Sequence, residues 1–110
     1  MTPGRQVTTT LPDRAAAEQL AARVVEERLA ACAQVLGPVA STYRWQGTVE
    51  QAEEWYCHCK TTAARFPALR DRIRELHPYD VPEIIAVPIT DADPAYLAWI
   101  VDATTPASAS

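Results

Sequence analysis

Two long strand-like runs on either side of Gly47 constrain the fold of this chain more than any other feature. They span residues 33–46 and 49–61, whereas an ordinary strand has about five or six residues. Alternating side chains predict β-strands, and the glycine between the runs predicts a tight turn. Gly37 and Pro38 predict a bend within the first run. We therefore expect a long β-hairpin that projects beyond a small domain.

The segments around this hairpin define a secondary-structure order. A short β-branched strand is expected at residues 6–10, and a helix is expected to begin after Asp13. Apolar residues at helical spacing predict a second helix over 66–76. Residues 83–89 are apolar on both faces and predict a strand central in a sheet, and a last short helix is expected to start at Asp93. The order βαββαβα predicts an α+β, ferredoxin-like fold, in which two helices cover one face of an antiparallel sheet.

Length and composition limit the classes of function. A chain of 110 residues with 48% hydrophobic residues suits one domain, expected over residues 1–103, with a disordered tail over 104–110. The net charge of −4 favours neither a nucleic-acid nor a membrane partner. We expect neither a membrane span nor a signal peptide. Three cysteines without framework spacing indicate a reducing compartment, the cytoplasm.

The second long strand carries large side chains on both faces. Trp55, Cys57 and Cys59 should point one way, and Tyr56 and His58 the other. The cysteines with the intervening histidine resemble a metal-binding tract, but the histidine points away from both sulfurs and a zinc site needs four ligands. Core packing is the favoured interpretation of the cysteines. If helices cover their face, a symmetric oligomer is the simplest cover for the other face.

The connector between the second helix and the last strand carries the strongest signal of a functional site. Pro78 and Pro82 stiffen a segment that also holds His77, Tyr79 and Glu83. Rigid connectors with several polar side chains often form binding sites. We expect these three side chains to line a ligand-binding cleft between subunits, with His77 titrating near neutrality. The alternative, that they only hold the oligomer together, remains open.

Two further residues are candidates for the same cleft. Lys60, the single lysine, should lie on the uncovered face of the sheet, where it either pairs with Glu83 or binds an anion. Trp45 beside the glycine turn either forms one wall of a ligand site or anchors a subunit interface. A solvated acidic edge that discourages aggregation is expected near the hairpin tip, formed by Glu50, Glu53 and Glu54.

Several local motifs occur together in one order. They are Glu26-Glu27-Arg28-Leu29-Ala30-Ala31-Cys32, Tyr43-Arg44-Trp45-Gln46-Gly47, Lys60-Thr61-Thr62, His77-Pro78-Tyr79-x-x-Pro82-Glu83 and Tyr96-Leu97-x-Trp99. In this combination the chain resembles the CutA divalent-cation tolerance proteins, from about Thr8 to Asp102. The resemblance implies a ferredoxin-like subunit, related in architecture to the PII signalling proteins, in a tight homotrimer whose hairpins reach the neighbouring subunits. It also implies a link to metal tolerance, with binding of copper or other divalent ions and no settled reaction.

The copper ligands implied by the resemblance are only partly present. In copper-binding members they are a cysteine at the end of the first strand and a histidine pair at the end of the second helix. The matching positions here are Thr9 and Leu76-His77, so His77 alone is retained as a metal ligand and copper binding should be weak. We expect a trimeric binding protein that responds to a metal ion or small ligand, with no catalytic residues and no required cofactor. A trimeric scaffold, or an enzyme with an acid–base site in the intersubunit cleft, remains the alternative.

Overall fold

A computed structural model describes residues 4–106 and confirms the expected order of elements. Asp13 caps the first helix by accepting a hydrogen bond from the backbone N–H of Ala16, and Asp93 caps the last helix in the same manner. Both helices therefore begin where the sequence indicates. In chain order the elements are β1 (Gly4–Leu11), α1 (Arg14–Glu26), β2 (Cys32–Trp45), β3 (Thr48–Thr62), α2 (Phe66–Leu76), β4 (Ile85–Ile89) and α3 (Pro94–Ala103).

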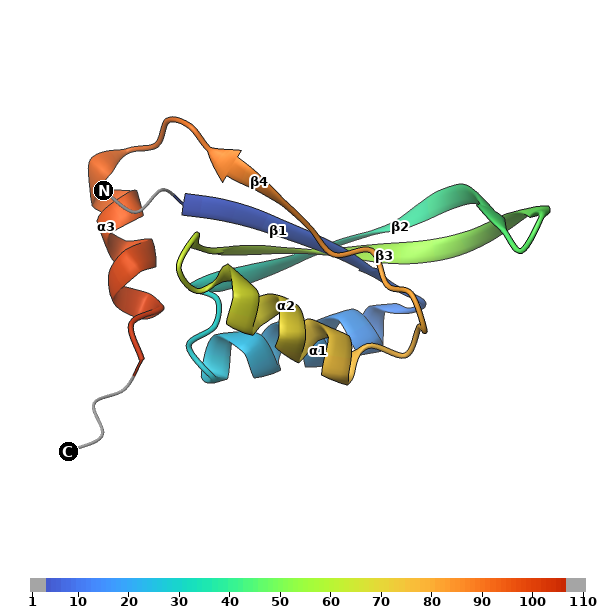
Figure 1. The fold of residues 1–110 in the computed structure, drawn as a ribbon, viewed down its shortest axis with the longest axis horizontal. Coiled ribbons are helices and arrows are strands. Elements are labelled where there is room, and N and C mark those ends of the chain that lie inside the picture. Colours follow the sequence, from blue (N-terminus) through green and yellow to red (C-terminus); the bar gives the residue numbers. More distant parts are fainter. Residues whose placement is uncertain (1–3, 107–110) are drawn as a thin grey trace.

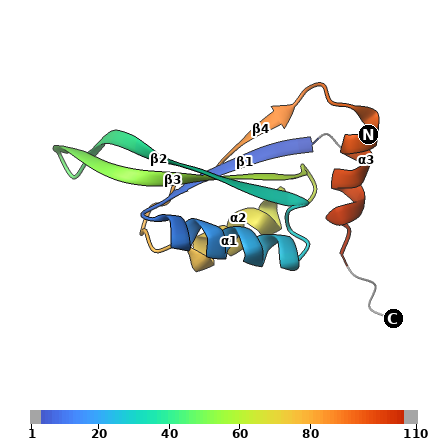
Figure 2. The ribbon, with the colours of Figure 1, turned by 180° about the vertical axis from the view of Figure 1, so that it is seen from behind.

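The four strands form one antiparallel sheet in the order β2-β3-β1-β4. Helices α1 and α2 lie side by side on one face of this sheet in both views (Figures 1 and 2), and α3 lies at the end of the sheet opposite the hairpin tip. This arrangement confirms the α+β, ferredoxin-like prediction. The face of the sheet opposite α1 and α2 is hereafter called the open face.

The hairpin of β2 and β3 extends well beyond the other strands. The pairing of β1 with β3 ends at Leu11 and Trp55, and the part of β3 that precedes Trp55, from Thr48 to Glu54, pairs only with β2. The hairpin turn is made by Gln46 and Gly47, whose φ angles of 49° and 82° are both positive, as in the turns that suit a tight hairpin. The expected projecting hairpin is therefore present, and it lengthens the subunit to 48 Å.

The predicted bend in β2 is a shift in strand register. The shift lies between Leu36 and Val39, so β2 has one more residue than β3 across this stretch. Gly37 within it packs closely against the indole of Trp55. A β-carbon added at Gly37 would lie 2.7 Å from Cδ2 of that ring, so a larger residue would displace the tryptophan.

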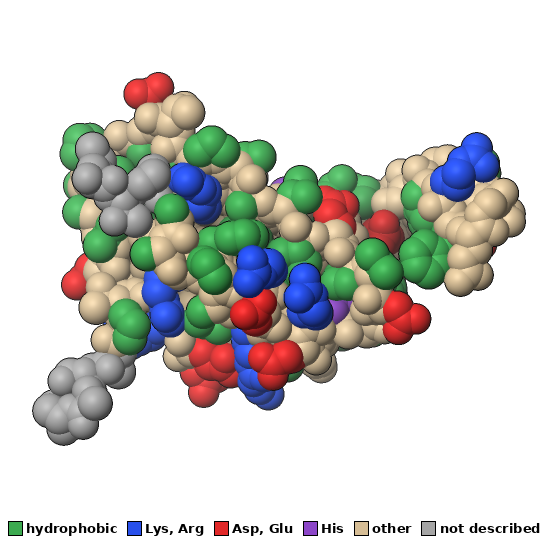
Figure 3. Space-filling view, viewed as in Figure 1, with side chains coloured by type: hydrophobic (Ala, Val, Ile, Leu, Met, Phe, Trp, Pro, Cys, Tyr) green, Lys and Arg blue, Asp and Glu red, His purple; other side chains and the backbone are tan. Residues whose placement is uncertain are grey.

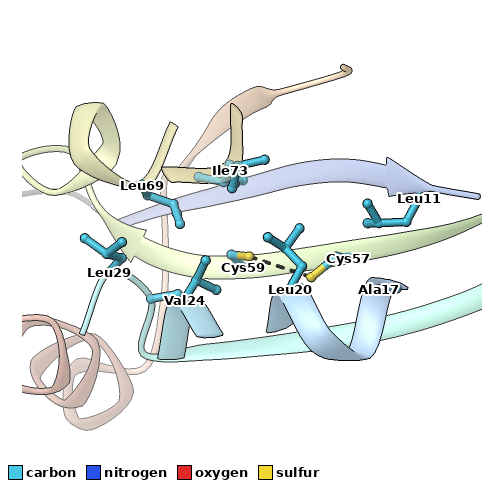
Figure 4. Close-up of a cluster of buried hydrophobic side chains, with 11 residues drawn as sticks. Leu11, Ala17, Leu20, Val24, Leu29, Cys57, Cys59, Leu69 and Ile73 are labelled. Carbon is cyan, nitrogen blue, oxygen red and sulfur yellow. Dashed lines mark hydrogen bonds between the residues drawn. The ribbon is translucent and has the colours of Figure 1, made fainter. Parts of the chain in front are cut away.

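The hydrophobic core lies between the sheet and the two helices, as Figure 4 shows. Cys57 and Cys59 are fully buried in it, with their sulfur atoms 3.9 Å apart. The hydrogen bond with the Cys57 thiol, together with burial, raises the pKa of Cys59, so this thiol stays protonated. The core interpretation of these cysteines is confirmed. The other buried residues of this cluster are Val7, Leu11, Ala17, Leu20, Val24, Leu29, Ala30, Leu69 and Ile73.

The prediction that the last strand is central was wrong. β4 begins at Ile85 rather than at residue 83 and lies at the edge of the sheet, beside β1. Its apolar character on both faces has a different cause: Ala86 packs on the core, whereas Ile85 and Val87 lie on the open face and are about half exposed. An apolar pattern on both faces does not reveal whether the second face is buried within the same subunit.

The C-terminal boundary also differs from the expectation. Thr104, which was placed in the tail, is buried and its hydroxyl donates to the carbonyl of Ile100. The folded part therefore includes at least this residue. Residues 1–3 of the expected domain and residues 107–110 of the expected tail lie outside the described residues.

Burial of the two core thiols predicts slow chemical modification. In a Cys32→Ser background, Cys57 and Cys59 should stay unmodified by a thiol reagent in native buffer and react together on unfolding in guanidinium chloride. Absorbance of the released thiolate measures the reaction. Rapid labelling of both thiols before unfolding would contradict the assignment of their faces.

Candidate functional site

A cavity of about 760 Å³ lies where the hairpin leaves the body of the subunit. Its walls come from the hairpin, the end of β1 and the connector that precedes β4. Trp45, Tyr79 and Glu83, three of the five expected site residues, line it. In the space-filling view, acidic and apolar side chains lie next to one another between the body and the hairpin tip (Figure 3).

The cavity contains an acidic residue that was predicted to lie elsewhere. Glu54, expected on a solvated edge, is only 8% exposed and accepts a 2.9 Å hydrogen bond from the hydroxyl of Tyr79. The alternation of side chains along the strand could have predicted this position, because Glu54 lies on the same face of β3 as Tyr56, which was expected to be covered. Glu50 and Glu53 are exposed, as expected. Glu54 is thus the buried carboxylate of the site.

The two carboxyl groups of the cavity influence one another. Burial, and then the negative charge of Glu54, raise the pKa of Glu83 above its usual value. Burial and the bond to Glu54 likewise raise the pKa of Tyr79, so its hydroxyl remains a donor throughout the physiological range. The site therefore has negative potential, and Glu83 accepts a proton more readily than an exposed glutamate.

His77 lies behind the cavity wall and holds the connector in place. It is 9% exposed and both ring nitrogens are engaged: Nε2 lies 2.7 Å from the carbonyl oxygen of Thr10, and Nδ1 lies 3.1 Å from the backbone nitrogen of Tyr79. A carbonyl only accepts and an amide N–H only donates, so Nε2 carries the proton and Nδ1 is the acceptor. His77 thus ties the connector to β1 rather than facing a ligand.

The expected titration of His77 near neutrality is not supported. Burial lowers its pKa, and this effect outweighs the opposite effects of the Thr10 carbonyl and of the Glu54 charge. Protonation would also place a hydrogen on Nδ1, facing the amide N–H of Tyr79. The neutral imidazole is therefore the form that the fold stabilises.

Lys60 does not reach the cavity. It pairs in register with Gln6 and Cys32, far along β3 from Glu54, and its Nζ donates to Oε1 of Gln34 at 2.8 Å. The expected ion pair with Glu83 does not form between these two described residues. Lys60 instead lies on the open face near the end of the sheet that carries α3.

The residues implied as copper ligands do not fit a metal centre here. Thr9 is fully buried opposite Cys57 in the register of β1 and β3, so it faces the helices rather than the cavity, and its Oγ1 has no hydrogen-bond partner. Both nitrogens of His77 are already occupied. Over residues 4–106 no three histidine, cysteine, aspartate or glutamate side chains gather closely enough to hold a metal ion, whereas a transition metal requires several converging ligands.

Fold and sequence together place the chain in a known class of small α+β proteins. The CutA1 divalent ion tolerance protein family model matches residues 6–103. The divalent-cation tolerance protein CutA of Thermus thermophilus is 45% identical over 94 residues, which cover 86% of this chain and 91% of that protein. The crystal structure of CutA from Xylella fastidiosa has a TM-score of 0.91 at 40% identity, covering 94% of this chain and 99% of that one. The chain belongs to the CutA1 divalent ion tolerance family.

The comparisons leave the expected compartment open. A structure of CutA from Archaeoglobus fulgidus, 32% identical with a TM-score of 0.89 over 93% of this chain and 99% of that one, is described as periplasmic. Across residues 4–106, none of the helices is long and apolar enough to span a membrane.

The hydrogen bond between Tyr79 and Glu54 predicts a measurable contribution to stability. Tyr79→Phe leaves a buried carboxylate without this donor and should lower the free energy of unfolding by about 1–3 kcal/mol. Tyr43→Phe is the matched control, because the Tyr43 hydroxyl has no hydrogen bond to the described residues, and its change should stay within about 0.5 kcal/mol. Urea unfolding at one protein concentration measures both. Equal effects of the two variants would contradict the assigned role of Tyr79.

The lowered pKa of His77 predicts acid sensitivity. The unfolded chain binds a proton more readily than the folded chain, so stability from neutral His77 is complete above about pH 6.5 and is lost as the pH falls through the lower, folded-state pKa. Urea unfolding at pH 7.5 and 5.5 should show this loss in the wild type and less of it in His77→Gln. His58→Gln measures the separate contribution of the other histidine, whose pKa is lowered by burial and then by Lys60, so that the part due to His77 can be told apart from it. An unchanged pH dependence in His77→Gln would show that this imidazole does not carry the effect.

Proposed function

We propose that this protein is a homotrimeric, non-catalytic binding protein of the CutA type, which responds to a metal ion or small ligand bound at the cavity beside the hairpin. The observation that carries the proposal is the cavity itself. It combines a buried carboxylate, Glu54, with Tyr79 and Glu83 on a connector that His77 ties to the sheet. Pre-formed concave sites with a few placed polar groups are typical of small-ligand binding.

The open face of the sheet supports the trimeric part of the proposal. Leu36, Ile85 and Val87 lie on this face and are 59%, 52% and 49% exposed. Apolar side chains are therefore exposed at both edges of this sheet face, on β2 and on β4, which suits an interface that covers the whole face. Further copies of the chain would cover this face and the projecting hairpin, and the cavity beside the hairpin would then border a neighbouring subunit.

Two observations support a binding rather than a catalytic role. His77 is the imidazole closest in sequence to the cavity residues, and it cannot accept a proton without losing its contact with Tyr79. Glu83 has a raised pKa, yet no imidazole or thiol lines the described cavity beside it. Nucleophilic catalysis needs such a pair within hydrogen-bond reach.

The three cysteines are all unpaired, which supports a reducing compartment such as the cytoplasm.

Sedimentation equilibrium and a binding screen test the proposal together. At micromolar concentration the protein should sediment as a trimer. A thermal-shift screen of divalent metal ions, anions and small organic compounds should yield at least one that stabilises the wild type. Ser41→Trp fills the cavity and should abolish this stabilisation, whereas Gln51→Trp places the same ring elsewhere on the hairpin and should not. A stable monomer, or no compound that distinguishes the wild type from Ser41→Trp, would overturn the proposal.

A further inference from the structure

We propose that the cavity binds an organic cation, an ammonium group carried on an apolar body, in preference to a bare metal ion or an anion. This inference rests on the proposed function, because it assigns a ligand class to the same cavity. It follows from three observations: the residue types that line the cavity, the unbonded carboxylate oxygen of Glu54, and the positions of the acidic side chains, which do not converge on one point.

The lining combines carboxyl groups with aromatic rings. Three acidic residues are present, and none of the described lining residues is a lysine, arginine or histidine. Aromatic faces attract cations, and ammonium groups are commonly bound by several rings together with nearby carboxylates. Arg44, the arginine nearest in sequence, points to the other face of the hairpin by strand alternation and does not line the cavity. The aromatic residues of the lining are Tyr43, Trp45, Tyr56 and Tyr79.

Glu54 supplies an oxygen for a ligand. Glu54 is more than nine-tenths buried. Its Oε2 accepts the hydrogen bond from the hydroxyl of Tyr79, whereas its Oε1 has no hydrogen-bond partner among the described residues. A buried carboxylate that is only partly hydrogen-bonded favours a positive partner. In this subunit no Lys or Arg side chain of the described part supplies one, since Glu54 has no ion pair there.

The positions of the acidic side chains suit an organic cation better than a metal ion as the ligand of the cavity. A calcium or magnesium ion needs oxygens that converge to about 2.0–2.6 Å from one point. Glu54, Asp80 and Glu83 do not gather in this way, since no metal-binding group of three such side chains occurs over residues 4–106. An ammonium ion on a carbon frame needs only one near carboxylate, and the remaining rings contact its apolar part.

The size and the remaining lining agree with a ligand that has an apolar body. The cavity of about 760 Å³ lies within the range of about 300–1,000 Å³ that small-molecule sites occupy. Val81 and Pro82 of the connector add apolar wall between the acidic residues. An anion would meet the negative potential that already raises the pKa of Glu83.

Choline and its neutral carbon isostere, 3,3-dimethylbutan-1-ol, provide a direct test. Isothermal titration of the full-length protein should show choline binding at least about tenfold more tightly than the isostere. Glu54→Gln keeps the shape and an acceptor for Tyr79 while removing the charge, and it should weaken choline about tenfold. Glu53→Gln removes the same charge from the adjacent residue, outside the cavity, and should leave binding within about twofold. Trp45→Leu removes one of the aromatic faces that contact the ammonium group and should weaken choline binding by about 2- to 30-fold.

Each other outcome counts against the inference. Equal affinity for choline and its isostere, or choline binding unaffected by both Glu54→Gln and Trp45→Leu, would overturn it. So would tight binding of Mg²⁺ or Cu²⁺ alone that is lost in Glu54→Gln while choline has no effect. If choline fails but another class of compound binds and is blocked by Ser41→Trp, the inference fails and the proposed function stands. If nothing binds, both fail.

Discussion

The alternation of side chains along β3 is the constraint on which the rest of the structure depends. One set, which includes Cys57 and Cys59, completes the core beneath the helices. The other set, which includes Glu54 and Tyr56, faces the open side of the sheet and its cavity. A shift of one residue in the pairing of β3 would exchange the two sets. It would expose the apolar side chains of the core, and it would bury Glu54 beneath the helices without the hydrogen bond from Tyr79. The packing of the core and the geometry of the site therefore require the same register.

The cavity exists because β3 is longer than its neighbour β1. On the hairpin side of Trp55, from Glu54 back to Thr48, β3 does not pair with β1, and the connector that follows α2 runs past the end of β1 instead. Two polar contacts hold it there: His77 bonds to the carbonyl of Thr10, and Tyr79 bonds to Glu54. An isolated two-stranded hairpin is marginally stable in water. The connector therefore supports the base of the hairpin at the same point where it forms the cavity wall.

The chemistry of the site is thus separate from the residues that the family resemblance implied for copper. Thr9 lies on the helix-covered face, and His77 is used in positioning. The groups that face the cavity are carboxylates, phenols and an indole. Membership of the CutA1 family specifies the subunit architecture, whereas the ligand class that we propose for this chain depends on side chains such as Glu54 and Trp45.

Local patterns in the sequence were sufficient to predict most of the fold. Caps at Asp13 and Asp93, the turn at Gly47 and the two faces of β3 follow from hydrogen bonding and periodicity within a few residues, and each is found as expected.

Only the tertiary structure decided how distant segments meet. Tyr79 and Glu54 are 25 residues apart, and their contact depends on the sheet order and on where β1 ends. The same order places β4 at an edge, although its composition suggested the centre, and it keeps Lys60 away from Glu83. Periodicity specifies the face on which a side chain lies, but the neighbours on that face are set by strand pairing between distant parts of the chain, which no local pattern encodes.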